Sequence, residues 1–167
     1  MDTPFCWDCF DTPFGRLLAT ADEAGNLLGL RTAEGADTGT LGRHVPALLA
    51  EVGRQLTAYC GGELRDFDLP LLLHGSPFQL AAWRALQAIP YGETLSYGEQ
   101  ARALGQPGAA RAVGLANNRN PIMLIVPCHR VIGSNGALVG FGGGLPLKQA
   151  LLAFEQAKSG RGNLPLF

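Results

Sequence analysis

The sequence predicts an α/β (α+β) protein. A small N-terminal antiparallel β-sheet lobe with one helix precedes a mostly helical C-terminal lobe that contains a helix-turn-helix. β-type segments separated by turn signals fill the first part of the chain, whereas helical periodicity dominates the rest. The charge also changes sign: residues 1–75 carry five Lys and Arg against eleven Asp and Glu, and residues 76–167 carry eight against three. We therefore divide the chain into an N-terminal α/β lobe, residues 1–74, and a C-terminal domain, residues 75–167.

The elements of the N-terminal lobe are predicted from its turns and its apolar spacing. Residues 4–33 contain short β-type segments separated by TPFG at 12–15 and DEAGN at 22–26, which favours an antiparallel meander. From His44 to Tyr59 apolar residues recur at helical spacing, and Gly61-Gly62 follows as a helix stop.

The C-terminal domain begins with a clear helix start. After the extended stretch FDLPLLL, Ser76 is predicted as an N-cap with Pro77 at the first helical position, and the helix ends before Pro90. Trp83 lies on the apolar face of this helix and is expected in the core.

Two shorter helices are expected next. Residues 97–104 and a second segment that runs through about Ala116 are predicted to be helical, with the turn Gly105-Gln106-Pro107-Gly108 between them. Ser96 and Glu99 have the spacing of a capping box. Such a pair is typical of a helix-turn-helix, although many folds that bind no DNA also contain one.

The second of these helices is slim. Alanines and glycines surround its single cation, Arg111, so the helix can approach a backbone or a groove closely. The alternative is that the small residues pack this helix on its neighbour and that Arg111 is a solvated surface residue. The charge asymmetry between the two halves of the chain also has two interpretations. Either the positively charged second half binds an anion, or the two lobes attract each other.

Composition excludes several classes of protein. A chain of 167 residues can bury a core without metal or disulfide staples, and 47% hydrophobic with 16% charged residues argues against disorder. No apolar run approaches the ~20 residues that span a bilayer, and the N-terminus lacks the pattern of a secretory signal. We expect a cytoplasmic protein whose four cysteines are thiols: Cys6, Cys9, Cys60 and Cys128.

The stretch VPCHRVI, residues 126–132, contains the candidate nucleophile Cys128. A thiol with a pKa near ~8.5 needs an adjacent base or cation to react at neutral pH, and His129 follows directly. Neighbours on a strand point to opposite faces, so direct contact would require a turn at Pro127 or a bridging water. Glu155 is the one acidic residue after Glu99 and is the candidate to orient His129. A structural Cys-His pair is the alternative.

The motif is similar to that of a known family. PCHRVI, with RNP at 119–121 before it and GFGGGLPLKQALLAFE at 140–155 after it, resembles the O6-alkylguanine-DNA alkyltransferases, or methylated-DNA–protein-cysteine methyltransferases. The match runs from about residue 78 to 155 and includes PYGETLSYGEQA and AARAVG. It implies single-turnover DNA repair, in which the alkyl group of O6-alkylguanine, and of O4-alkylthymine, moves to a cysteine of a DNA-binding and alkyl-acceptor domain.

The resemblance also implies roles for individual residues. Cys128 would accept the alkyl group, His129 would activate the thiol through a water, and Glu155 would orient His129. Asn120 would brace the turn that holds the site. Tyr97 would assist the departing guanine and meet the 3′ phosphate.

On the DNA side, the resemblance implies an arginine finger, Arg111, that replaces a nucleotide flipped out of the duplex. The expected partner is double-stranded DNA, bound through its minor groove by a monomer that needs no cofactor. The remaining residues expected at the DNA are Ala110, Gly114 and Ser134, and those expected at the substrate pocket are Val131, Phe141, Gly142 and Gly143. Phe141 stands where many relatives have Tyr, so one hydroxyl is missing from the pocket rim, and the glycine run that follows makes the loop roomier.

Other features of the sequence concern metal binding, the C-terminal tail and rival functions. Cys6 and Cys9 form a CxxC, but the further zinc ligands would have to come from Cys60, His44 or His74 without a recognisable spacing, so core or surface thiols are expected and no metal. The tail SGRGNLPLF is expected to be poorly ordered or strapped along the surface. Two rival functions remain: a lesion-recognition protein without transfer, and a hydrolase with a Cys-His-Glu triad.

Overall fold

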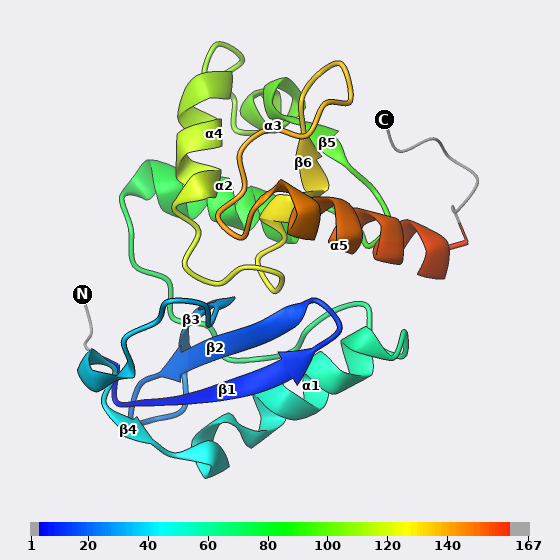
Figure 1. Cartoon of the computed structure of the whole chain (residues 1–167). Helices are drawn as coiled ribbons and strands as arrows, with labels where there is room; N and C mark the ends of the chain where they lie inside the picture. Colours follow the sequence, from blue (N-terminus) through cyan, green and yellow to red (C-terminus); the bar gives the residue numbers. More distant parts are fainter. Residues whose placement is uncertain (1–3, 161–167) are drawn as a thin grey trace. The chain divides into compact units, whose positions relative to one another are not determined.

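The computed structural model describes residues 4–160, which form two compact units (Figure 1). One unit comprises the described residues up to His74 and the other those from Gly75 onward. The sequence predicts a tail that is poorly ordered or strapped along the surface. The part of this tail beyond Gly160 lies outside the described residues. None of the described helices is long and apolar enough to cross a membrane.

The first unit contains a four-stranded sheet in the order β3-β2-β1-β4. Its strands are β1 (Cys6–Thr12), β2 (Gly15–Ala21), β3 (Leu27–Thr32) and β4 (Arg43–His44). The first three form the predicted antiparallel meander, with turns where TPFG and DEAGN indicate them. The sheet is nevertheless mixed, because β4 pairs with β1 in parallel, which the sequence analysis did not predict.

Contacts between residues distant in the sequence explain this fourth strand. The amide of Arg43 donates to the carbonyl of Phe5, and the guanidinium of Arg43 lies 4.8 Å from the centre of the Phe5 ring. His44 stacks on Trp7 and bonds Asp8 at 2.8 Å. A two-residue strand has too little periodicity to be recognised from sequence, so only these partners reveal it.

The helix predicted from His44 begins later than expected. A 3-10 turn spans Pro46–Leu49, and α1 then spans Ala50–Cys60. Proline disfavours a helical conformation for the residue before it, Val45, and His44 belongs to strand β4. Gly62 adopts a positive φ of 79° after the helix, as the predicted glycine stop requires. Figure 1 shows α1 along one face of the sheet.

The second unit is mostly helical, as predicted. Its helices are α2 (Pro77–Gln87), α3 (Tyr97–Ala103), α4 (Ala110–Asn118) and α5 (Leu145–Lys158). Both predicted N-caps are confirmed: Ser76 and Ser96 each accept from the backbone three residues on, and Gln79 and Glu99 complete the two capping boxes. Two short parallel strands, β5 (Leu95–Ser96) and β6 (Val131–Ile132), pair within the unit.

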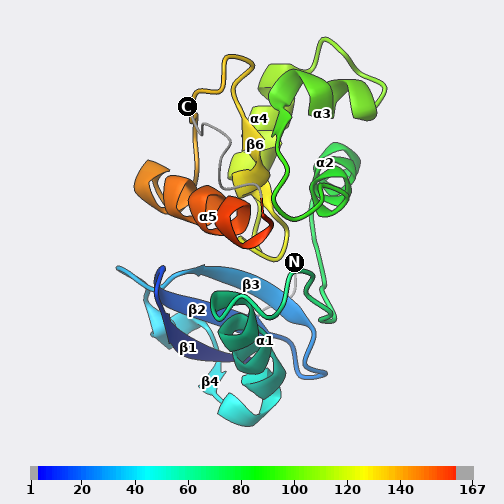
Figure 2. The same ribbon diagram turned by 90° about the vertical axis from the view of Figure 1, so that its right-hand side faces the viewer.

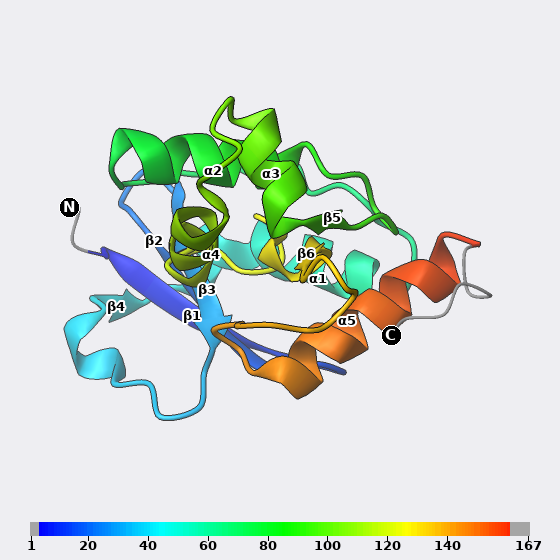
Figure 3. The same ribbon diagram turned by 90° about the horizontal axis from the view of Figure 1, so that it is seen from above.

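Buried polar contacts hold α2, α3 and α4 together (Figure 3). Trp83 is buried as predicted, and its indole N–H donates to the carbonyl of Ala116 at 2.9 Å. Gln100 and Asn117 exchange reciprocal amide bonds of 2.8 and 3.1 Å, and Gln100 also donates to the carbonyl of Ala82. Because each partner belongs to a different helix, these bonds determine how α3 and α4, the helix-turn-helix pair, pack against each other and against α2.

Candidate active site

A braced turn presents the cysteine. The side chain of Asn120 donates to the carbonyl of Val126 at 2.7 Å and accepts from the amide of Ile122 at 3.0 Å. Between these two contacts Leu124 adopts a φ of 72°, a conformation that costs an L residue energy. Asn120 therefore stabilises a strained turn directly before the cysteine.

Cys128 opens a one-turn 3-10 helix, Cys128–Arg130, so the chain turns here rather than continuing as a strand. The thiol is buried, and burial raises the pKa of Cys128, while the amide of Asn120 and the charge of Lys148 act to lower it. The raised pKa means that the thiol is mostly protonated at neutral pH. Nucleophilic chemistry at Cys128 thus needs a base.

His129 and Glu155 form a fully buried pair, with His129 Nε2 2.8 Å from Glu155 Oε2. Arg130 shares the same carboxylate, donating from Nε at 2.7 Å and from Nη2 at 3.1 Å, and its Nη1 donates to the carbonyl of Ile89. Burial alone would raise the pKa of Glu155, but His129 and Arg130 outweigh it and hold that pKa well below its usual range. Glu155 is therefore ionised, and α5, which carries it, lies beside the cysteine turn (Figure 2).

An ionised Glu155 decides which nitrogen of His129 carries the proton. A carboxylate only accepts, so Nε2 must be the N–H that donates to Glu155. In the neutral form of the ring, Nδ1 is then the acceptor, and this nitrogen is buried with no hydrogen-bond partner among the described residues. An unengaged lone pair in this position is what a general base requires.

Lys148 is a site residue that the sequence analysis missed. It is fully buried, and its Nζ donates to the carbonyl of Val139 at 3.0 Å and lies 3.5 Å from the hydroxyl of Tyr97. Burial lowers the pKa of Lys148 to about 8, against which Cys128 acts in the opposite direction. A signal was present: Lys148 lies two helical turns before Glu155 and hence on the same face of α5.

Tyr97 closes this cluster. Its hydroxyl donates to the carbonyl of Val139 at 2.7 Å, and burial, followed by the nearby Cys128, raises the pKa of Tyr97. The phenol therefore stays protonated and remains a donor. Because Tyr97 begins α3, this contact joins the helix-turn-helix to the loop that leads to α5.

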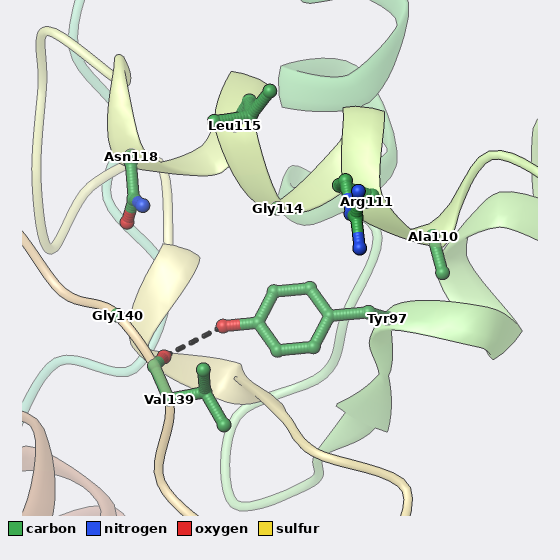
Figure 4. Close-up of a pocket in the computed structure, with 8 residues that line it drawn as sticks. All are labelled: Tyr97, Ala110, Arg111, Gly114, Leu115, Asn118, Val139 and Gly140. Carbon is green, nitrogen blue, oxygen red and sulfur yellow. Dashed lines mark hydrogen bonds between the residues drawn. The ribbon is translucent and has the colours of Figure 1, made fainter.

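A hollow of about 370 Å³ opens beside Tyr97 (Figure 4). It is lined by Tyr97, Ala110, Arg111, Gly114, Leu115, Asn118, Val139 and Gly140. The structure thus brings together four residues that the sequence analysis placed at the DNA. It adds four residues that the sequence analysis did not name, and none of the described residues that line the hollow is acidic.

The remaining predicted residues lie elsewhere in the same unit. Val131 is buried in β6, and Ser134 is exposed in the loop after it. Phe141, Gly142 and Gly143 follow the hollow's last lining residue in the loop before α5. A Cβ at Gly143 would come within 2.6 Å of Cδ2 of Leu147, so a larger residue there would require the Leu147 side chain to shift.

The candidate zinc ligands do not come together. Within residues 4–160 no group of three His, Cys, Asp or Glu side chains is arranged to hold a metal. Cys6 is buried in β1, and burial raises its pKa, as expected for a thiol of the core.

A buried cysteine lies next to a His–carboxylate pair, and the same unit contains a helix-turn-helix that exposes an arginine. This combination is typical of cysteine-dependent proteins that bind nucleic acid. Comparison with known proteins agrees. Residues 77–157 match the model of the 6-O-methylguanine DNA methyltransferase DNA-binding domain. The chain belongs to this methyltransferase family.

Several relatives are similar over nearly their whole length. A methylated-DNA–protein-cysteine methyltransferase of Mycolicibacterium paratuberculosis is 54% identical over 89% of this chain and 91% of its own. One of Methanosarcina acetivorans is 48% identical over 87% of this chain and 95% of its own. The crystal structure of Mycobacterium tuberculosis OGT in complex with DNA superposes with a TM-score of 0.85 at 48% identity, covering 92% of this chain and 94% of that one.

Proposed function

We propose that this protein repairs alkylated DNA by moving the alkyl group of O6-alkylguanine to Cys128, once per molecule. The observation that carries the proposal is the buried His129–Glu155 pair beside Cys128, in which Nδ1 of His129 has no hydrogen-bond partner within residues 4–160. Relatives of this chain are named methylated-DNA–protein-cysteine methyltransferases, and this chain is an enzyme of that class. Its acceptor residue and the roles that follow are our assignments.

The transfer is a displacement at the alkyl carbon. His129 Nδ1 takes the thiol proton of Cys128 through a water, and the thiolate Sγ attacks the carbon. The S–C bond forms as the C–O6 bond breaks, and the electron pair stays on O6. The base then takes up a proton from water and remains in the DNA strand as normal guanine. Glu155 stabilises the imidazolium. Tyr97, whose single O–H donates to the carbonyl of Val139 in the free protein, redirects this O–H to the departing base. The thioether persists, so the molecule acts once, and no cofactor enters the balance.

DNA binding is assigned to the C-terminal domain, residues 75–167, which includes the segment that matches the DNA-binding model. An alkylated base must leave the stack before a buried thiol can reach it, at a cost of a few kcal/mol. We assign Arg111 as the side chain that replaces it, and Ala110 and Gly114 as the small residues that let α4 approach the minor groove. Ser134, exposed in the loop after β6, is assigned to the DNA backbone.

We assign the pocket for the flipped base to Val131, Phe141, Gly142 and Gly143. The proposed substrates are O6-alkylguanines with methyl and larger adducts, and O4-alkylthymine. The missing hydroxyl at Phe141 removes one hydrogen bond worth about 0.5–1.5 kcal/mol. We propose further that the protein works as a monomer on double-stranded DNA. A thiol that must stay reduced suits the cytoplasm.

Intact mass with peptide mapping tests the proposal. After mixing with a duplex that contains one O6-methylguanine, the peptide with Cys128 gains one methyl group in stoichiometric amount, and Cys128→Ala gains none. Binding without a mass change would favour a lesion-recognition protein. Release of product with repeated turnover and an unmodified thiol would favour a hydrolase.

A further inference from the structure

Leu115 is the most exposed large apolar side chain of the described residues, at 61% exposure. It lies on α4, whose inward face is formed by Val113, Ala116 and Asn117. A single exposed leucine is ordinary on a protein surface, so exposure alone carries no conclusion. The position of Leu115 is what distinguishes it.

Exposed apolar side chains gather at the hollow beside Tyr97. Four large hydrophobic residues of the described chain are exposed, and two of them, Leu115 and Val139, line this one hollow. Arg111 lines it as well, one helical turn before Leu115 (Figure 4). The surface that exposes the arginine is therefore bordered by aliphatic groups.

If α4 runs along the duplex, the spacing from Arg111 to Leu115 corresponds to one to two nucleotide steps. Four residues of an α-helix span about 6 Å, whereas successive nucleotides of one strand are about 3.4 Å apart along the duplex. If Arg111 replaces the flipped nucleotide, Leu115 lies one to two base steps away. Aliphatic side chains that enter the minor groove pack on sugars and base edges and unstack the step they meet.

We propose that Leu115 is a second DNA-contacting wedge, which packs in the minor groove one to two base steps from the nucleotide that Arg111 replaces. This inference rests on the proposed function. The occupant is duplex DNA, because the hollow contains a cation and no carboxylate and because it lies on the helix-turn-helix. The contact is apolar, so it adds affinity without neutralising a phosphate.

Salt dependence separates this role from an ionic one. We would measure the affinity of Leu115→Ala for an undamaged duplex and for one with a single O6-methylguanine, at several salt concentrations, in a Cys128→Ala background that prevents transfer. We expect about tenfold weaker binding of the damaged duplex, which is about 1.4 kcal/mol, at every salt concentration. The slope of log K against log salt stays the same, whereas loss of a phosphate contact lowers it by about one.

Two further variants act as controls. Leu145→Ala removes another exposed leucine, 44% exposed at the start of α5 and outside the hollow, and should bind like the parent. Leu115→Met keeps the apolar volume and should retain most of the affinity. With Cys128 present, Leu115→Ala should react with iodoacetamide at the parental rate, because the wedge does not touch the thiol chemistry.

Three results would each overturn the proposed role of Leu115. They are parental affinity of Leu115→Ala for the damaged duplex, a changed slope of log K against log salt in this variant, and an equal loss of affinity in Leu145→Ala. Failure of the underlying function shows itself differently: the unsubstituted protein would then gain no methyl group from the damaged duplex. The two failures are therefore distinguishable.

Discussion

The carboxylate of Glu155 serves two residues at once. It accepts from His129 and from Arg130, all three being buried, and the guanidinium of Arg130 balances the charge of the carboxylate. We assign Arg130 as a positioning residue that holds the carboxylate in place. We propose two functions for Glu155, pairing with Arg130 and orientation of His129, and substitution can separate them.

Glu155→Gln should lower the rate of thiol alkylation by iodoacetamide at least 100-fold at pH 7, because the base loses its partner. It should also lower the free energy of unfolding by about 3 kcal/mol, because a buried guanidinium is left unpaired. The double variant Glu155→Gln, Arg130→Met should regain stability in urea unfolding but not the rate. A double variant that recovers both would show that the slow reaction of the single variant came from misfolding.

Lys148 carries a pH dependence with a definite sign. Its pKa is lowered to about 8 in the folded protein, so between pH 8 and its ordinary value near 10.5 the unfolded chain binds more protons than the folded one. The stability of the parent should therefore rise with pH across this window, relative to Lys148→Met, by an amount on the order of 2–3 kcal/mol. Urea unfolding of both proteins at pH 7.5 and 10 measures this difference. A constant difference would refute the lowered pKa.

At the scale of elements, the helix starts could be predicted, but the contacts between helices could not. Ser76, Pro77, Ser96 and Glu99 follow local capping rules, which depend only on residues three or four apart. Gln100 and Asn117 are seventeen residues apart, and nothing local distinguishes them from surface amides. Their reciprocal bonds appear only when α3 packs on α4.

This buried amide pair predicts a coupling between the two helices. Asn117→Leu or Gln100→Leu alone should cost about 1–3 kcal/mol in unfolding free energy, because each leaves the other amide partly unsatisfied. The double variant should cost less than the sum of the two single variants, by at least 1 kcal/mol. Strict additivity in urea titrations would mean that the pair does not act as a unit.

At the scale of the whole molecule, the charge division predicts where DNA binding resides. Arg111 in the second unit and Arg31 in the first are both exposed, which makes them a matched pair. Arg111→Gln should weaken binding of an undamaged duplex about tenfold and reduce its salt dependence, whereas Arg31→Gln should change affinity less than twofold. Equal losses in fluorescence-anisotropy titrations would contradict the assignment of DNA binding to the C-terminal domain.

By itself, the sequence determined the fold class, the three-stranded meander, the capped helices and the cysteine motif, because each depends on neighbours in the chain or on a distinctive run of residues. Only the tertiary structure decided the parallel pairing of β4, the burial of Lys148 against Val139 and Tyr97, and the sharing of Glu155 by His129 and Arg130. Apart from the contact between Lys148 and Val139, these features join residues 25 to 51 positions apart in the sequence. Buried polar groups find their partners through packing, and a single sequence does not record which distant groups meet.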